Sequence, residues 1–144
     1  MDKRLLTAPC GLDCFNCPVQ ESNITDEVRN GVAGALHISP EEAGCKGCKP
    51  EQGRCRFTQD CATWDCAAQK GVAFCYECDD FPCGLLAPTL KGAEYPHNMK
   101  VYNLCRMKLI GIDGWIEETP EIRDRYYNGE LVIGQGPVIE KDAE

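Results

Sequence analysis

The sequence predicts a small metal-stabilised domain, mainly α-helical, with irregular cysteine-rich zinc-knuckle loops and at most short β-strands. Eight of the twelve cysteines fall between residues 45 and 83, a stretch with several glycines and little helical periodicity. Apart from a helix at 96–110, the recognisable helices are short or interrupted. Because such a loop-rich segment buries little apolar surface, a structural zinc ion, which contributes about 10–16 kcal/mol in small zinc peptides, can replace the missing core.

Three closely spaced groups of cysteines indicate metal binding. Two Cys-x-x-Cys pairs, Cys45/Cys48 and Cys75/Cys78, each place two thiolates in one tight turn, and a third group near the N-terminus has the spacing C-x3-C-x2-C. Repeated pairs at a distance are the usual way in which four soft ligands reach one ion. The candidate metal ligands are Cys10, Cys14, Cys17, Cys45, Cys48, Cys55, Cys61, Cys66, Cys75, Cys78 and Cys83.

The first half of the chain predicts two helical segments. After a turn-rich entry at 8–20, residues 25–37 fit a helix that Thr25 caps and His37 ends. The SPEE segment at 39–42 has the signature of a capping box and supports about one turn. Gly47, inside the first cysteine pair, fits a tight turn that directs backbone N–H groups at sulfur.

The middle and the C-terminal part predict further helices. A helix follows Asp60, its expected cap, and ends before Gly71. Residues 72–78 fit a short strand, and Pro82 begins a helical turn. The helix at 96–110 ends at Gly111.

The remaining elements complete the expected domain organisation. On the helix at 96–110, Cys105 falls on the apolar stripe of Val101 and Leu109, so we expect it to be a small core residue rather than a ligand. Another helix begins near residue 113 and restarts at Thr119-Pro120, and residues 131–133 are a strand candidate. The chain divides into a cysteine-rich metal-binding domain at 1–118, with its knuckle core at 45–83, and a C-terminal helix with an acidic tail at 119–144.

The net charge and the first residues of the chain indicate which partners and which compartment to expect. The net charge of −8 argues against nucleic acid as the default partner. Residues 1–10 lack the apolar run of a signal peptide, and no stretch is long and apolar enough to span a membrane. We therefore expect a cytoplasmic protein with no membrane partner, in which reduced thiols bind metal. A protein partner fits this reading, but neither its identity nor the oligomeric state follows from the sequence.

Within 45–91, six basic and six acidic residues balance. The cysteine-rich segment is thus the least acidic part of the chain. Its basic residues Lys46, Lys49, Arg54 and Arg56 can offset the negative charge of a zinc ion held by four thiolates, or simply form a solvated basic loop.

Zinc, as two or three ions, is favoured as the cofactor, with a [4Fe–4S] cluster as the alternative, since four thiolates suit both. The N-terminal spacing matches that of radical-SAM enzymes, but the chain lacks the βα alternation of their barrel. A thiol–disulfide redox role lacks the thioredoxin-like context that lowers a cysteine pKa. No Ser/His/Asp arrangement, phosphate loop or carboxylate pair is recognisable, and neither His37 nor His97 has ligand spacing to a cysteine.

Chain proximity gives a first grouping of these ligands. Cys45 and Cys48 are expected to join Cys61 and Cys66, which lie on neighbouring turns of one helix. The group at 75–83 would take its fourth ligand from the N-terminal group and so hold the N-terminal segment against the second pair. The cysteines left over, Cys55 among them, would form a third site with a carboxylate or His, or remain free.

The motifs CGLDCFNCP at 10–18, GCKGC at 44–48, CAAQKG at 66–71 and CYECDDFPC at 75–83, followed by GIDGW at 111–115, resemble the prokaryotic cysteine-rich family catalogued as domain of unknown function 3795. The resemblance covers about residues 8–118. It implies a zinc- or metal-binding protein without an established activity, with ligands at positions 10, 14, 17, 45, 48, 61, 66, 75, 78 and 83. Two functions are compatible with it: a binding or adaptor module held in shape by structural zinc, which we favour, or an enzyme or redox protein with an open metal site or a cluster.

Overall fold

The computed structural model describes residues 1–57, 60–86 and 99–128. The described part of the chain contains three α-helices and four short 3-10 turns, in the order η1 (Cys14–Asn16), α1 (Asp26–Leu36), η2 (Pro40–Glu42), α2 (Ala62–Lys70), η3 (Cys75–Glu77), η4 (Gly84–Leu86) and α3 (Met99–Asn128). Within these ranges the only β pairing is two isolated bridges, Thr7 with Asp13 and Gln20 with Cys45. The prediction of a mainly helical chain is therefore confirmed.

The strand expected at 72–78 is wrong, because the second cysteine pair forms the helical turn η3 instead. Glu77 explains this turn, since its carboxylate reaches back and accepts hydrogen bonds from the N–H groups of Ala73 at 2.8 Å and Phe74 at 3.1 Å. Such a bond from the third residue to the start of a turn favours a helical over an extended backbone. The strand candidate at 131–133 lies outside the described residues.

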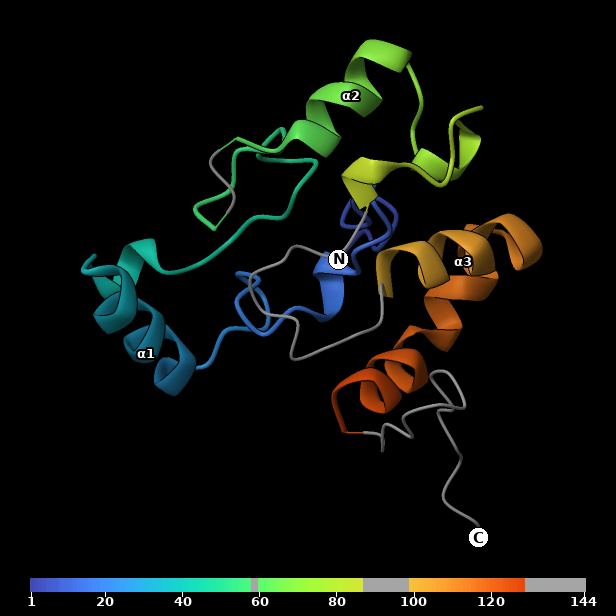
Figure 1. Cartoon of the computed structure of the whole chain (residues 1–144). Coiled ribbons are helices and arrows are strands. Elements are labelled where there is room, and N and C mark those ends of the chain that lie inside the picture. Colours follow the sequence, from blue (N-terminus) through green and yellow to red (C-terminus); the bar gives the residue numbers. More distant parts are fainter. Residues whose placement is uncertain (58–59, 87–98, 129–144) are drawn as a thin grey trace, which may run out of the picture.

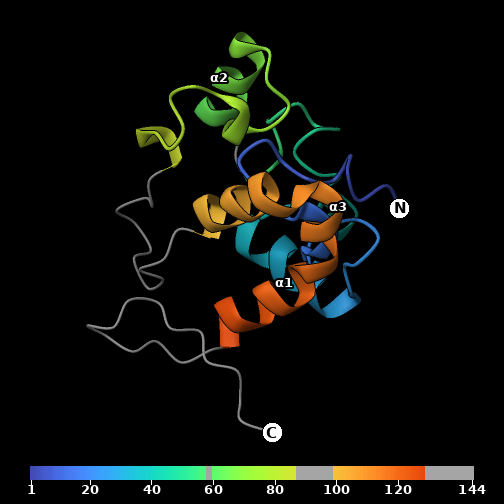
Figure 2. The same ribbon diagram turned by 90° about the vertical axis from the view of Figure 1, so that its right-hand side faces the viewer.

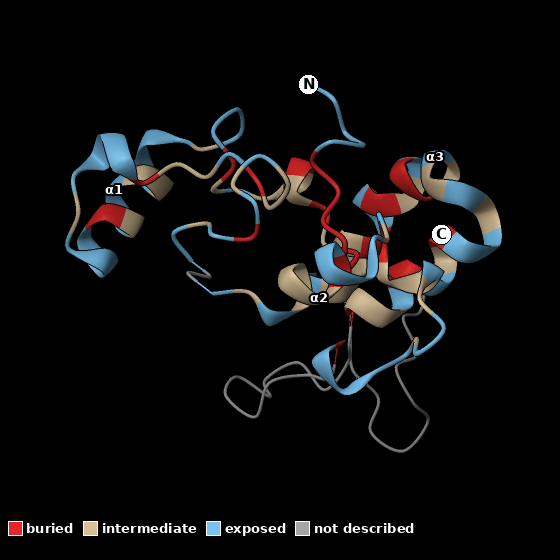
Figure 3. Cartoon of the chain, turned by 90° about the horizontal axis from the view of Figure 1, so that it is seen from above, coloured by how far each residue is buried: buried red, intermediate tan, exposed pale blue. Residues whose placement is uncertain are grey.

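The N-terminal segment runs through the middle of the molecule, with α1 and α3 on opposite sides of it (Figure 1, Figure 3). The view turned by 90° shows α2 and its cysteine loops at one end of this arrangement (Figure 2). The backbone N–H of Cys75 donates to the carbonyl of Pro9 at 2.9 Å. A backbone hydrogen bond thus holds the N-terminal segment against the second cysteine pair, whereas the sequence predicts this contact through a shared metal ligand.

The hydrophobic core forms where this segment meets α3. The ring of Phe15 packs edge-on against Trp115, with centroids 6.0 Å apart, and Trp115 is fully buried. The other buried members of the core are Leu6, Ala8, Cys10, Phe74, Leu86, Leu104, Met107, Ile116 and Ile122. Only Phe74 and Leu86 of these residues come from 45–86, the cysteine-rich half of the chain. Most of the core therefore lies outside this half.

Polar contacts fix the same interface. The buried Asn103 side chain donates to the carbonyl of Gly11 at 2.7 Å. Gly11 has a φ of +87°, and a Cβ there would lie 2.9 Å from the backbone oxygen of Lys100. Close approach of α3 therefore requires glycine at this position.

Helix α3 is interrupted at Gly111, whose φ of 77° and ψ of 166° are not helical. The predicted end of the first helix at Gly111 is confirmed, and a second helical run continues to Asn128. Pro120 does not restart this run. The hydroxyl of Thr119 donates to the carbonyl of Ile116 at 2.7 Å, which satisfies the acceptor that proline, having no N–H, leaves free.

The apolar stripe expected on this helix is wrong. Cys105 is exposed, and Leu109 is 74% exposed. The buried face instead carries Asn103, Leu104 and Met107. The long-range hydrogen bond of Asn103 turns this polar residue inward and so turns Cys105 toward solvent.

The other helix ends follow local signals. Thr25 caps α1 by accepting the N–H of Val28 at 3.3 Å, and Gly71 ends α2 with a φ of 65°. The capping box at 39–42 is present, with Glu42 accepting the N–H of Ser39 at 3.1 Å. Asp60, however, does not cap α2, because Cys61 takes that position and Asp60 pairs with Arg54.

The cysteine-rich half has few buried side chains of its own. Figure 3 shows the buried residues gathered around the N-terminal segment and α3, whereas α2 is largely half-buried or exposed. Ala67 is the buried residue that α2 contributes. No helix of the described part of the chain is long and apolar enough to cross a membrane.

Candidate metal centre

Three side chains of the first cysteine loop bring their ligand atoms within 4.8 Å of one another: Cys45, Glu51 and Cys55. The sulfur of Cys45 lies 3.7 Å from a carboxylate oxygen of Glu51. The other oxygen accepts the backbone N–H of Lys46 at 3.1 Å, which orients the carboxylate. Two thiols and a carboxylate are donors that zinc accepts, so this triad fits a metal ion.

The turn between Cys45 and Cys48 has the predicted geometry. Gly47 has a φ of +104°, and its N–H points at the sulfur of Cys45 across 3.4 Å. A Cβ on Gly47 would lie 2.7 Å from a methyl carbon of Leu6. The turn therefore needs glycine both for its backbone conformation and for its packing.

Burial controls the protonation of the thiols around this turn. It raises the pKa of Cys45 to about 12, with a smaller contribution from the charge of Glu51. It also raises the pKa of Cys48 to about 12 and that of Cys14 to about 11. These thiols are neutral near pH 7 without a metal, and a cation that replaced their protons would remove the cost of burying their negative charge.

The N-terminal group meets the first cysteine pair. The charges of Cys10, Cys14, Cys61 and Cys55 all contribute to the raised pKa of Cys48, after the larger effect of burial. The Cβ of Cys14 lies 3.7 Å from the position that a Cβ on Gly47 would take. The N-terminal segment therefore approaches both cysteine pairs, the first through Cys14 and the second through the backbone of Cys75.

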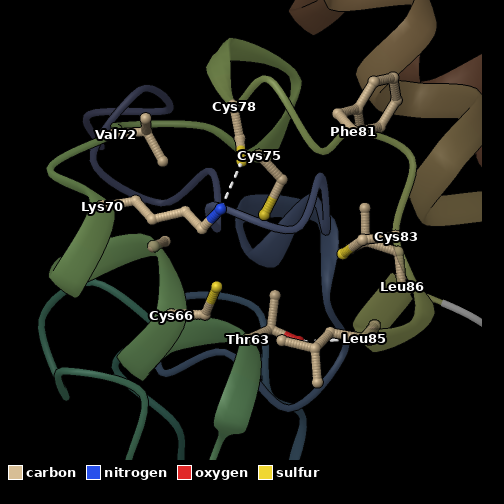
Figure 4. Close-up of a pocket in the computed structure, with 11 residues that line it drawn as sticks. Thr63, Cys66, Lys70, Val72, Cys75, Cys78, Phe81, Cys83, Leu85 and Leu86 are labelled. Atoms are coloured by element: carbon tan, nitrogen blue, oxygen red, sulfur yellow. Dashed lines mark hydrogen bonds between the residues drawn. The ribbon is translucent and has the colours of Figure 1, made fainter.

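A second collection of thiols lines a pocket between α2 and the turns η3 and η4: Cys66, Cys75, Cys78 and Cys83 (Figure 4). Val72, Phe81, Leu85 and Leu86 form its apolar walls. Lys70 reaches in from the last turn of α2, and its ammonium lies 3.3 Å from the sulfur of Cys78.

The family comparison matches residues 6–88 to a family described as a protein of unknown function, DUF3795. The chain belongs to the DUF3795 family. No curated protein and no solved structure matches the chain. The match covers all eleven predicted ligands of this DUF3795 protein, but it ends before the 111–115 motif that the sequence resemblance included.

The structure only partly reproduces the expected grouping of cysteines in the DUF3795 chain. Cys45, expected to join Cys61 and Cys66, lies instead with Glu51 and with Cys55, one of the cysteines left over by the prediction. Cys66 lines the pocket with the group at 75–83 instead of joining the first pair, because α2 directs it toward η3. Cys17 directly follows η1, and among the described residues its thiol belongs to neither the triad nor the pocket.

Glu51 is the site residue that sequence reasoning did not name. A carboxylate partner for Cys55 was one of the open alternatives, and Glu51 lies four residues before it. Glu51 becomes a candidate ligand because of the way its loop folds. The N–H of Glu51 donates to the carbonyl of Gly47 at 3.1 Å, and the N–H of Gly53 donates to the carbonyl of Cys48 at 2.8 Å. These bonds bend the loop back, so that Glu51 faces Cys45.

Proposed function

We propose that this DUF3795 protein binds zinc, as two or three ions, and that the ions hold its cysteine-rich loops in a shape that a protein partner recognises. The observation that supports this most directly is the triad of Cys45, Glu51 and Cys55, whose ligand atoms lie within 4.8 Å of one another. Cys14, next to the same turn, can supply a fourth ligand and close the site. A zinc site closed by four protein ligands is structural.

The scarcity of buried residues in the cysteine-rich half supports a structural role for the metal. Loops with little apolar surface are not held by the hydrophobic effect, and the free energy of metal binding then becomes folding free energy. Phe57 and Leu85, next to these loops, are 44% and 46% exposed. Such apolar side chains on a metal-held frame provide contact area for a protein partner.

Elemental analysis of protein purified without oxygen tests the proposal. We expect at least two zinc ions per chain and a colourless sample. A folded protein without bound metal would contradict the proposal. A brown sample that contains iron and sulfide would replace zinc with an iron–sulfur cluster.

A second function follows if the triad keeps its fourth position open. Three protein ligands with a bound water are typical of catalytic zinc. The triad borders a pocket lined by Gly44, Glu51, Arg54, Cys55 and Arg56, through which a small molecule can reach the metal. X-ray absorption at the zinc edge separates the two functions, since four protein ligands indicate a structural site and an exchangeable water oxygen indicates an enzyme.

A further inference from the structure

The pocket between α2, η3 and η4 gathers four thiols that belong to three separate parts of the chain. Cys66 lies on α2, Cys75 and Cys78 lie on or just after η3, and Cys83 precedes η4. Figure 4 shows the side chains of Cys66, Cys75 and Cys83 turned toward the same space. Four thiols around one cavity are the donor set of a structural zinc site.

We propose that Cys66, Cys75, Cys78 and Cys83 form a second zinc site, separate from the triad, with Lys70 as its charge-compensating neighbour. This extends the proposed function to a set of ligands that does not depend on the triad. The cavity has a volume of about 20 Å³, which is room for roughly one water-sized sphere.

Lys70 provides the electrostatic complement of such a site. Four thiolates around Zn²⁺ carry a net charge of −2, which is costly beside apolar walls unless a cation lies close. The ammonium of Lys70 donates to the sulfur of Cys78 at 3.3 Å and also pairs with Asp80. This pairing keeps Lys70 at the rim, where it can donate to a metal-bound thiolate without being a ligand itself.

Metal binding must draw the four sulfurs together. Among the described residues, the triad is the group of three or more ligands whose atoms all lie within 4.8 Å, so the pocket thiols are more widely spaced. Cys83 is the thiol best placed to move, because its side chain is exposed and the next residue, Gly84, has free space around it. A Cβ built on Gly84 would meet no atom within 4 Å. Cys75 is anchored by the backbone bond to Pro9, and Cys66 by its helix.

Alkylation of the native chain, read by mass spectrometry, tests the grouping without any substitution. In the zinc-loaded protein we expect all four pocket thiols to resist iodoacetamide, and a graded chelator titration to expose them together, at a different concentration from Cys45 and Cys55. Exposed Cys105 is the internal control that reacts throughout. Rapid labelling of Cys66 while Cys75, Cys78 and Cys83 stay protected would overturn the proposal, and so would loss of the pocket and triad protection in a single step.

Variants then separate the pocket from the triad. Cys66→Ser should lose one zinc per chain, Cys55→Ser should lose another, and the double variant should lose two, whereas Cys105→Ser should lose none. Lys70→Met should weaken zinc binding at the pocket about 10-fold or more, with Lys108→Met as the matched surface control. Full zinc content in Cys66→Ser, or no greater loss in the double variant than in Cys55→Ser, would overturn the second site while leaving the proposed function intact. Absence of zinc from the unsubstituted protein would overturn both.

Discussion

The backbone N–H of Gly47 points at the sulfur of Cys45 across 3.4 Å, in a turn where Gly47 has a φ of +104°. This relationship joins backbone conformation to metal chemistry. An N–H directed at sulfur stabilises the thiolate form, which is the form that binds a metal. Only a glycine reaches this conformation without strain.

Gly47→Ala should therefore damage both the fold and the site. A non-glycine residue at positive φ costs about 1–2 kcal/mol, and contact with Leu6 adds to this cost. We expect a lower midpoint in urea denaturation and weaker zinc retention in a competition with a chelator. Gly31→Ala on α1 is the control, since a Cβ there meets no atom within 4 Å and no proposed ligand lies on that helix. Equal stability and equal zinc retention in the two variants would contradict this account of the turn.

The ion pair between Arg123 and Asp13 should be important for stability. The Asp13 side chain is only 4% exposed, and Arg123 donates to it at 2.7 Å. Arg123→Met would leave a buried carboxylate whose remaining side-chain donor, among the described residues, is Asn16, at a cost of about 3–5 kcal/mol. Urea denaturation measures the change.

Arg106→Met is the matched control for this prediction. Arg106 pairs with Glu118 across 2.6 Å, but both side chains are partly exposed, so its loss should cost only about 0–1 kcal/mol. If the two variants lost the same stability, burial of Asp13 would not be the cause.

Zinc binding should release protons over a wide pH range. Burial raises the pKa of Cys45 and Cys48 from the ordinary 9.0 to about 12, so both thiols stay protonated in the metal-free fold until well above pH 9. A raised thiol pKa means that each ligand must lose its proton to the solvent when zinc binds. The apparent association constant should therefore rise about 10-fold per pH unit for each coordinating thiol.

Calorimetric titration in buffers of different ionisation enthalpy counts these protons. The share of the released protons that comes from Cys45 and Cys48, about two protons if both bind zinc, should persist above pH 9. Loss of that share above pH 9 would show that these two thiols titrate at their ordinary pKa, contrary to their burial.

Features that depend only on residues close in sequence could be predicted without the structure. Thr25, Gly71 and Gly111 mark helix ends through their own backbone preferences, and the turn at Gly47 follows from the spacing of its cysteines. The stripe containing Cys105 was wrong because Asn103 is buried by a hydrogen bond to Gly11, 92 residues away in the chain. Apolar spacing along a helix cannot show such a partner.

The grouping of the metal ligands could not be predicted either, because it too depends on contacts between residues that are distant in sequence. Cys61 and Cys66 are close in sequence, but Cys61 occupies the N-cap position of α2, outside the pocket that Cys66 lines with Cys75. Glu51 becomes a candidate ligand only after its loop bends back on Cys45. Cysteine spacing predicts that metal can be bound, and the tertiary fold decides which side chains share an ion.

The central claim is that metal ions take the place of a hydrophobic core in the cysteine-rich loops. Hydrogen exchange of the zinc-loaded protein, compared with the same protein in excess chelator, tests it most directly. The claim predicts that amides of 45–57 and 71–83 lose protection on chelation, while those of α3 around Leu104 and Trp115 keep theirs, because packing against the N-terminal segment holds them. Unchanged protection of the cysteine loops, or a uniform loss across the whole chain, would contradict it.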